Sequence, residues 1–243
     1  MAELGDRLVV TLDRSEVRNA IDAAMVAALH EVCAEVEARP RPLVVTGGPE
    51  IFAAGADIRQ LRDRTREDAL AGINSSLFDR VAALPAVTVA AVAGPAIGGG
   101  AELAYACDFR VVTATARFAN PEARLGIMAA AGACWRLQEL VGEPLAKEVL
   151  LAGASIDAER AVAAGLANEL VAAADDLLPA AHAWVDRVLR AAPLAVRLTK
   201  AALRAPRAAH PFVDDVAQAV LFETDEKRRR MDAFLDRCPI CPA

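Results

Sequence analysis

Two short, almost wholly apolar runs constrain the fold of this chain most, because a glycine-rich loop follows each of them at once. The first is "PLVVTG" (42–47), which leads into "GGPEIFAAGAD", and the second is "VTVAAVAG" (87–94), which leads into "PAIGGG". Apolar runs of this length without alternation are typical of strands that are buried on both faces of a sheet. Helices must then cover the sheet, which predicts an α/β fold.

The remaining pattern supports this expectation. Strands are predicted at 7–12, 108–113, 117–118 and 167–171, with a small turn between the second and third, and helices at 22–38, about 58–84, from the glycines at 98–100, from Pro121, and almost everywhere after 131. Asp157 and Gly165 are predicted to cap a helix over 158–164. We therefore expect an α/β core over 1–190 and a helical C-terminal region over 191–243.

Composition and charge narrow the function classes. The 243 residues are 55% hydrophobic and 4% aromatic, so the chain can bury a large core without disulfides or metals. A net charge of −6 argues against a nucleic-acid surface. The one basic run, Lys227–Arg230, fits either a solvated helix face or a site for a ligand phosphate.

Five scattered cysteines do not form a disulfide framework, which indicates a reducing compartment. Cys238 and Cys241 have CxxC spacing and are either two free thiols in a tail or part of a zinc or redox module, but no second pair accompanies them. No apolar run approaches the ~20 residues of a membrane span, and the N-terminus does not resemble a signal peptide. We expect a soluble, cytoplasmic protein with no metal.

Neither glycine-rich loop matches a known phosphate-binding motif, and no G-x-S-x-G nucleophile elbow is present. Both loops are nevertheless able to present bare backbone N–H groups. Gly99 lies near a helix N-terminus, and a second N–H from the 55–57 loop would converge with it to form an oxyanion hole. Tight turns for close packing are the alternative interpretation of the same glycines.

Three carboxylates lie close to these loops. Glu102 is in the first turn of an otherwise apolar helix, Glu122 follows Pro121 at another helix start, and Asp57 precedes the helix at Ile58. Each is also explained as a favourable charge or cap at a helix N-terminus. If the two short strands after residue 107 fold the chain back, both glutamates enter one apolar pocket, where burial raises their pKa toward neutrality and suits them to acid and base catalysis.

Five segments together resemble the crotonase, or enoyl-CoA hydratase/isomerase, superfamily over nearly the whole chain. They are "RNAID" (18–22), "VVTGGPEIFAAGADI" (44–58), "GPAIGGGAELAYACDFRV" (94–111), "ANPEARLGI" (119–127) and "AVAAGLANELV" (161–171). The resemblance implies a ββα-spiral core with a helical C-terminal trimerisation region, assembled as a homotrimer or homohexamer. It also implies an acyl-CoA thioester substrate of fatty acid metabolism such as β-oxidation, with no prosthetic group or metal.

The resemblance assigns roles to residues as well. Backbone N–H groups of Ala56 and Gly99 would hold the thioester oxygen, and Glu102 and Glu122 would act on water and on the substrate double bond. Contacts with coenzyme A are implied for Arg18, Ala56, Asp57, Ile58 and Gly99. The presence of both glutamates favours hydration of a 2-enoyl-CoA to a 3-hydroxyacyl-CoA.

Two alternatives remain open. The same fold also fits a Δ3-Δ2 enoyl-CoA isomerase or another CoA-thioester lyase. A non-catalytic acyl-CoA binder is the other alternative, because the segment 127–135, "IMAAAGACW", departs from the proline and glycine pair that is usual in the family. An isomerase would move a double bond without needing Glu102, and a binder would hold CoA esters without turnover.

Overall fold

The computed structural model describes residues 1–236, which separate into two compact units, Met1–Val185 and a second unit that begins at Asp186. The boundary between the units falls inside helix α9 (Leu177–Leu189). The domain division expected after residue 190 stays a prediction. Cys238 and Cys241 lie outside the described residues.

The first unit is built on a six-stranded sheet in the order β1-β2-β3-β4-β6-β9. The strands are β1 (Ala2–Glu3), β2 (Leu8–Thr11), β3 (Leu43–Thr46), β4 (Thr88–Val92), β6 (Phe109–Thr113) and β9 (Glu169–Val171), and all neighbours are parallel except β1 and β2. Every residue of β3 and β4 is buried, as their continuous apolar runs predict. The predicted α/β class is confirmed.

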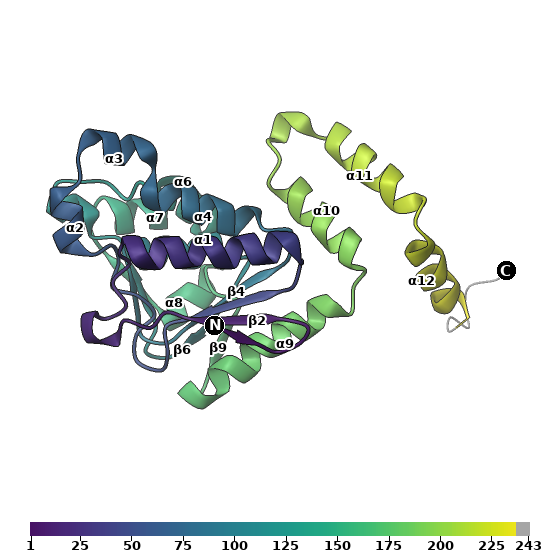
Figure 1. Ribbon diagram of the computed structural model, residues 1–243, viewed down its shortest axis with the longest axis horizontal. Coiled ribbons are helices and arrows are strands. Elements are labelled where there is room, and N and C mark those ends of the chain that lie inside the picture. The colour runs from purple at the N-terminus through teal and green to yellow at the C-terminus, as the bar shows by residue number, and fades with distance from the viewer. Residues whose placement is uncertain (237–243) are drawn as a thin grey trace. The chain divides into compact units, whose positions relative to one another are not determined.

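Four helices of the first half follow from local sequence signals. They are α1 (Ala23–Ala38), α2 (Ile58–Asp63), α3 (Arg66–Ala71) and α4 (Ile73–Ala83). Asp22 caps α1 by accepting from the Met25 N–H at 2.8 Å. The predicted helical region 58–84 is divided into three because Thr65 starts a new helix with a capping box and Gly72 ends it. In Figure 1, α1 and α4 lie side by side, and their apolar faces belong to the core with the sheet.

A second, three-stranded sheet has the order β5-β7-β8, formed by β5 (Pro95–Ile97), β7 (Arg117–Ala119) and β8 (Ser155–Asp157). The chain passes from β4 to β5 and then into α5 (Gly99–Ala106), and from β6 to β7 and then into the 3₁₀ helix η2 (Glu122–Leu125). Each passage is therefore one strand of the large sheet, one strand of the small sheet and one helix. A parallel bridge between Ala53 and Ala96 adds a third such passage, from β3 to α2.

The predicted strands 108–113 and 117–118 are present, but they do not pair with each other. β6 pairs with β4 and β9 in the large sheet, whereas β7 pairs with β5 and β8 in the small one. The turn between β6 and β7 therefore carries the chain from the large sheet to the small one. The sequence pattern does not predict this, because it gives no sign of strand β5, with which β7 pairs. Strand β8 is also unpredicted.

The rest of the first unit is mainly helical. It contains α6 (Ala133–Val141), α7 (Glu143–Leu150), α8 (Ala158–Ala163) and the 3₁₀ helix η3 (Ala174–Asp176). Asp157 caps α8 by accepting from the Arg160 N–H at 2.9 Å, as predicted.

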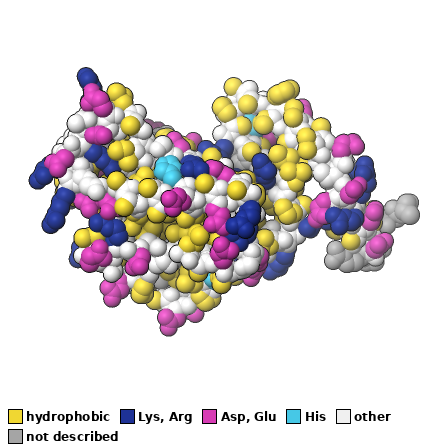
Figure 2. Space-filling view, in the orientation of Figure 1, with side chains coloured by type: hydrophobic (Ala, Val, Ile, Leu, Met, Phe, Trp, Pro, Cys, Tyr) yellow, Lys and Arg dark blue, Asp and Glu magenta, His cyan; other side chains and the backbone are white. Residues whose placement is uncertain are grey.

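The second unit contains α10 (Pro193–Leu203), the 3₁₀ helix η4 (Arg207–Ala209), α11 (Phe212–Phe222) and α12 (Asp225–Leu235). Figure 2 shows hydrophobic side chains gathered along α10 and α11. Several are largely exposed within this chain, namely Leu203, Phe212, Val216, Val220 and Phe222. On α12, Arg228, Arg229 and Arg230 form ion pairs with acidic residues of the same unit, which favours the solvated-face interpretation of this basic run.

Two general features bear on function. No helix in the described part of the chain is both long and apolar enough to cross a bilayer. Within residues 1–236 there is also no group of three or more His, Cys, Asp or Glu side chains arranged to hold a metal ion.

Candidate active site

The candidate site forms where three passages of the chain leave the small sheet. Ala53, β5 and β7 are parallel neighbours, so their carboxyl ends lie at one edge of that sheet. Ala56 follows Ala53, Gly99 follows β5, and Glu122 follows β7. The Gly98 N–H donates to the Ala119 carbonyl at 2.8 Å, which joins the end of β5 to the end of β7. Strand pairing thus brings residues that are far apart in the sequence close together in space.

The backbone near Ala56 is fixed by a short bridge to Ile21. The Ile21 N–H donates to the Gly55 carbonyl at 2.7 Å, and the Asp57 N–H donates to the Ile21 carbonyl at 3.0 Å. Because neighbouring N–H groups of an extended segment point in opposite directions, the Ala56 N–H faces away from this bridge.

Gly99 is the first residue of α5, where N–H groups have no intrahelical acceptor. A β-carbon built on Gly99 would lie 3.5 Å from the Ala56 nitrogen. Among residues 1–236 neither N–H donates a hydrogen bond. The structure therefore brings together the two backbone donors that the sequence singled out.

Glu102 is held in a nearly closed environment. It is 4% exposed, and its Oε1 accepts from the N–H groups of Ala131 at 2.8 Å and Ala133 at 3.1 Å. Burial raises the pKa of Glu102 to about 7, the nearby Glu122 carboxylate adds to the rise, and the two N–H groups oppose it. The side chain can therefore exist in either protonation state near neutral pH.

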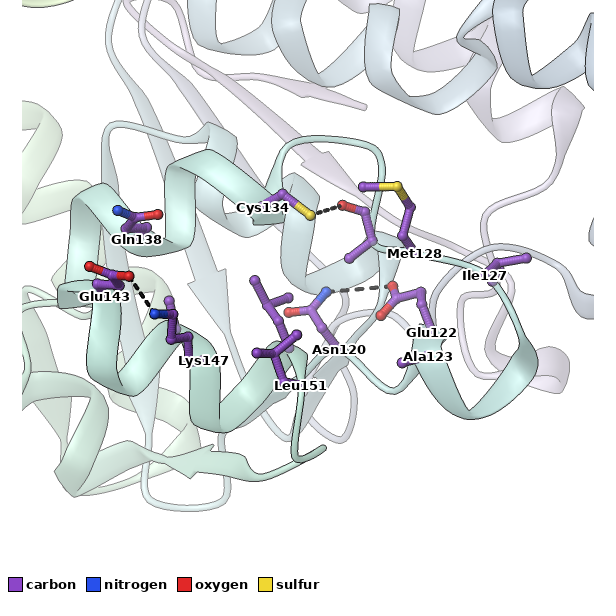
Figure 3. Close-up of a pocket in the computed structure, with 13 residues that line it drawn as sticks. Asn120, Glu122, Ala123, Ile127, Met128, Cys134, Gln138, Glu143, Lys147 and Leu151 are labelled. Carbon is purple, nitrogen blue, oxygen red and sulfur yellow. Dashed lines mark hydrogen bonds and ion pairs between the residues drawn. The ribbon is translucent and has the colours of Figure 1, made fainter.

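Glu122 occupies the first turn of η2, with Pro121 as its N-cap residue rather than the first helical residue that the sequence suggested. Burial raises its pKa, against the opposing effect of hydrogen bonds from its own backbone and from Asn120. Oε1 lies 3.5 Å from Asn120 Nδ2, as Figure 3 shows, and the buried Oε2 has no hydrogen-bond partner in the described chain. Tyr105 in turn donates to Asn120 Oδ1 at 3.1 Å, which orients the amide.

An ion pair between a buried arginine and an exposed aspartate supports the segment that holds Glu102. Arg136 is 5% exposed and donates to the Ala131 carbonyl at 3.3 Å and to Asp79 on α4 at 2.5 Å. Gly132 lies between the two residues whose N–H groups bind Glu102, and a β-carbon there would collide with the Arg136 guanidinium. Arg136 thus packs directly under the turn that supplies the two donors.

These groups line a cavity of about 820 Å³, a size usual for small-molecule sites. Of the residues predicted for the site, Ala56, Ile58, Gly99, Glu102 and Glu122 line it. Arg18 and Asp57 do not.

The structure gives these two residues other contacts. Asp57 caps α2 by accepting from the Arg59 N–H at 3.0 Å, which is the alternative role that the sequence left open. Arg18 is exposed, has a left-handed backbone with φ of 56°, and its carbonyl accepts from the Ala54 N–H at 3.0 Å. Its side chain is therefore outside the cavity wall, while its backbone steadies the loop that carries Ala56.

A smaller hollow of about 360 Å³ lies beside η2, α6 and α7 (Figure 3). It shares Glu122, Ile127 and Met128 with the larger cavity, and apolar side chains form most of its wall. An ion pair of 2.5 Å between Glu143 and Lys147 lies on that wall. Glu122 is therefore accessible from both hollows.

Sequence reasoning missed several polar side chains that build the site. Asn19 is buried, and its amide donates to the carbonyls of Gly47 at 2.8 Å and Phe52 at 3.1 Å, fixing the first loop. Asn74, Asn120 and Arg136 were also missed. The sequence signal for these residues is a polar residue within an apolar helical or strand pattern. This signal alone does not distinguish a buried polar side chain from an exposed one.

The raised pKa of Glu102 predicts a stability gain for Glu102→Gln that depends on pH. Its pKa lies near 7 in the folded state and near its ordinary value of 4.5 in the unfolded state. The folded chain therefore binds the proton more tightly, and stability is lost as pH rises from 4.5 through 7. Glutamine stays neutral, so we expect the variant to be more stable than the parent by about 1–3 kcal/mol at pH 8 and nearly equal at pH 4.5.

Denaturant unfolding at both pH values measures this difference. Glu139→Gln on α6 is the matched control, because Glu139 is exposed. An equal effect of Glu102→Gln at both pH values would contradict the assignment of a raised pKa.

Comparison with known proteins places this geometry in context. A family model described as enoyl-CoA hydratase/isomerase matches residues 7–239. A probable enoyl-CoA hydratase of Mycobacterium leprae is 33% identical over 240 residues, which cover 94% of this chain and 91% of that protein. The short-chain-enoyl-CoA hydratase of Clostridium acetobutylicum is 33% identical over 247 residues, which cover 96% and 92%. The crystal structure of an enoyl-CoA hydratase from Bacillus anthracis has a TM-score of 0.89 at 26% identity, over 97% of this chain and 95% of that one.

Proposed function

The chain belongs to the enoyl-CoA hydratase/isomerase family, and we propose that it adds water to a 2-enoyl-CoA to give a 3-hydroxyacyl-CoA. The observation that carries the proposal is one cavity that contains two carboxyl groups with raised pKa beside two backbone N–H groups that have no acceptor among residues 1–236. Relatives named as enoyl-CoA hydratases over nearly the full length support it.

In this mechanism the thioester oxygen lies between the N–H groups of Ala56 and Gly99. Addition of water at C3 moves the electrons of the double bond onto that oxygen, and donors that are already in place stabilise the charge without reorganising. Gly99 serves this role because a glycine leaves room for the oxygen beside its backbone. The dipole of α5 adds to the stabilisation, since its N-terminus faces the developing charge.

The two glutamates divide the proton transfers. Ionised Glu102 takes a proton from water as the water oxygen bonds to C3, and Glu122 donates a proton to C2 as the enolate collapses. After the reaction Glu102 is protonated and Glu122 is ionised. Exchange of protons with solvent then restores the starting state. Raised pKa values suit both residues to this exchange near neutral pH.

The rest of the substrate is placed by the surrounding surfaces. We propose that coenzyme A is contacted by the backbone near Arg18, Ala56, Asp57 and Ile58, with Ile58 exposed at the cavity wall. The smaller hollow beside Glu122 has a mainly apolar wall, so it is a suitable place for the acyl chain beyond C3.

Double-bond isomerisation is the second candidate, and one observation favours it. Glu122 Oε2 has no partner in the described chain, whereas Glu102 Oε1 is held by two N–H groups. If Glu122 alone takes a proton from C2 and returns it at C4, the double bond moves from C3–C4 to C2–C3.

The first experiment is to mix the purified protein with crotonyl-CoA, and then with a longer 2-enoyl-CoA, and to follow the ultraviolet band of the conjugated thioester. We expect rapid loss of the band, with 3-hydroxyacyl-CoA as the product identified by mass spectrometry. If the band persists with both substrates but the protein moves the double bond of a 3-enoyl-CoA, the isomerase is favoured. Tight binding of both esters without any turnover would favour an acyl-CoA binder.

We also propose that the protein is a homotrimer or a pair of homotrimers. The support is the row of exposed apolar side chains on α10 and α11, since large exposed apolar patches mark interaction surfaces. Light scattering of the purified protein measures the mass, and a monomer at micromolar concentration would contradict the proposal.

A further inference from the structure

Asn74, the second residue of α4, is a polar side chain of the cavity that the proposed mechanism does not use. It is 9% exposed and lines the same cavity as Ala56, Gly99, Glu102 and Glu122. Its Nδ2 is buried and has no hydrogen-bond partner among residues 1–236. A buried amide without an acceptor costs about 1–3 kcal/mol, so its retention at this position calls for a reason.

The orientation of the amide is set by a cation. Arg64 Nη1 donates to Asn74 Oδ1 at 2.7 Å. A guanidinium has only donors, so the oxygen of the amide must face Arg64 and the nitrogen must face away from it. Of the two possible orientations of the amide, only the one with Oδ1 toward Arg64 makes this hydrogen bond, so the position of Nδ2 is determined.

The free donor lies close to the space beside Gly99. A β-carbon built on Gly99 would lie 3.5 Å from the Ala56 nitrogen and 4.0 Å from Asn74 Nδ2, so both donors border the same point. That point is also adjacent to the Gly99 nitrogen. This side of Gly99 therefore faces both donors, and an oxygen atom bound in the cavity beyond it would have the Ala56 and Gly99 N–H groups and Asn74 Nδ2 as neighbours.

We propose that Asn74 is a third donor to the oxyanion hole, with Arg64 as the positioning residue that holds its amide. This inference rests on the proposed function in one respect, namely that the ligand is a CoA thioester. The Arg64 charge polarises the amide through its oxygen and makes Nδ2 a stronger donor. Asn74 would thus stabilise the enolate oxygen together with Ala56 and Gly99.

The test uses Asn74→Leu, which keeps the approximate volume of the side chain and removes the donor. Loss of one side-chain donor of an oxyanion hole lowers turnover strongly, and with two backbone donors remaining we expect a fall of about 10- to 100-fold in kcat with a smaller change in KM. Ser76→Ala is the matched control, because Ser76 is in the same helix turn but is exposed and does not line the cavity.

A spectroscopic measurement separates a direct contact from a structural role. A cinnamoyl-CoA thioester absorbs further to the red when its carbonyl is polarised, and the shift is read from bound ligand without any turnover. We expect the red shift to be smaller in Asn74→Leu than in the parent and in Ser76→Ala. Asn74→Asp, which replaces the donor with an oxygen in a side chain of equal size, should also reduce it.

An unchanged red shift and unchanged kcat in either Asn74 variant would overturn the inference. The same measurements distinguish a failure of this inference from a failure of the proposed function. A parent protein that polarises bound cinnamoyl-CoA but does not hydrate crotonyl-CoA would refute hydration and leave the third donor standing. A parent protein that hydrates crotonyl-CoA equally well after Asn74→Leu would refute the third donor alone.

Discussion

Glu122→Gln should lower the turnover of crotonyl-CoA by about 100- to 10,000-fold, the range over which a positioned acid or base usually contributes. Glutamine has nearly the same shape, but it cannot give a proton to C2 or take one back. Glu122 Oε2 makes no hydrogen bond in the described chain, so the change removes no structural contact from that oxygen. The fold should therefore persist while the reaction is lost.

Steady-state hydration and a thermal unfolding curve together measure this result. The matched control is Glu139→Gln, which alters an exposed carboxylate on α6 that lines neither hollow. Full hydration activity in Glu122→Gln would refute the mechanism. Glu102→Gln distinguishes the two candidate reactions, because it should abolish hydration but leave a double-bond migration that needs only Glu122.

The main elements of the fold could be predicted because their signals are local. The continuous apolar runs of β3 and β4, the cap Asp157 and the glycines before α5 each influence only the few residues next to them. Glu102 and Glu122 were recognisable for a similar reason, since a carboxylate in an apolar or glycine-rich setting is unusual. The family predicted from these motifs is confirmed by the match over residues 7–239.

Long-range pairing could not be predicted in the same way. Strands β5 and β8 have three residues each, too few for a periodic pattern, and yet β5 is the strand that aligns β7 and brings Glu122 to Gly98. The Arg136–Asp79 contact joins residues 57 positions apart, and nothing near either residue indicates the other. Both features are properties of the packed sheets and helices rather than of any short segment.

The unusual segment 127–135 has a physical explanation in these contacts. Glu102 is bound by the N–H groups of Ala131 and Ala133, which are backbone donors. Changes of side chain in this segment therefore leave the carboxylate contact intact, provided that Gly132 still makes room for Arg136. These backbone contacts thus weaken the argument for a non-catalytic binder. Ile127 and Met128 of the same segment line the cavity, so the unusual side chains there face the substrate.

Gly99→Ala should abolish hydration while the protein stays at least as stable as the parent. The new methyl group would lie 3.5 Å from the Ala56 nitrogen, which is an ordinary contact distance, so the backbone need not move. The methyl would, however, occupy the space proposed for the thioester oxygen, and we expect turnover to fall at least about 100-fold, as for loss of an oxyanion donor. Alanine also favours a helix over glycine by roughly 0.5–1 kcal/mol, so the unfolding temperature should not fall.

Gly100→Ala is the informative contrast, since it adds the same methyl group one residue later. There the β-carbon would overlap the Ala53 carbonyl oxygen and lie 2.7 Å from the Ala53 β-carbon, and both atoms belong to the bridge that joins β5 to its neighbour. We expect this variant to lose about 1–3 kcal/mol of stability, as overpacked cores do. Thermal unfolding, crotonyl-CoA hydration and cinnamoyl-CoA binding on both proteins make the comparison. A Gly99→Ala protein with normal kcat/KM would show that the thioester oxygen does not lie beside Gly99, and both the oxyanion hole and its third donor would have to be abandoned.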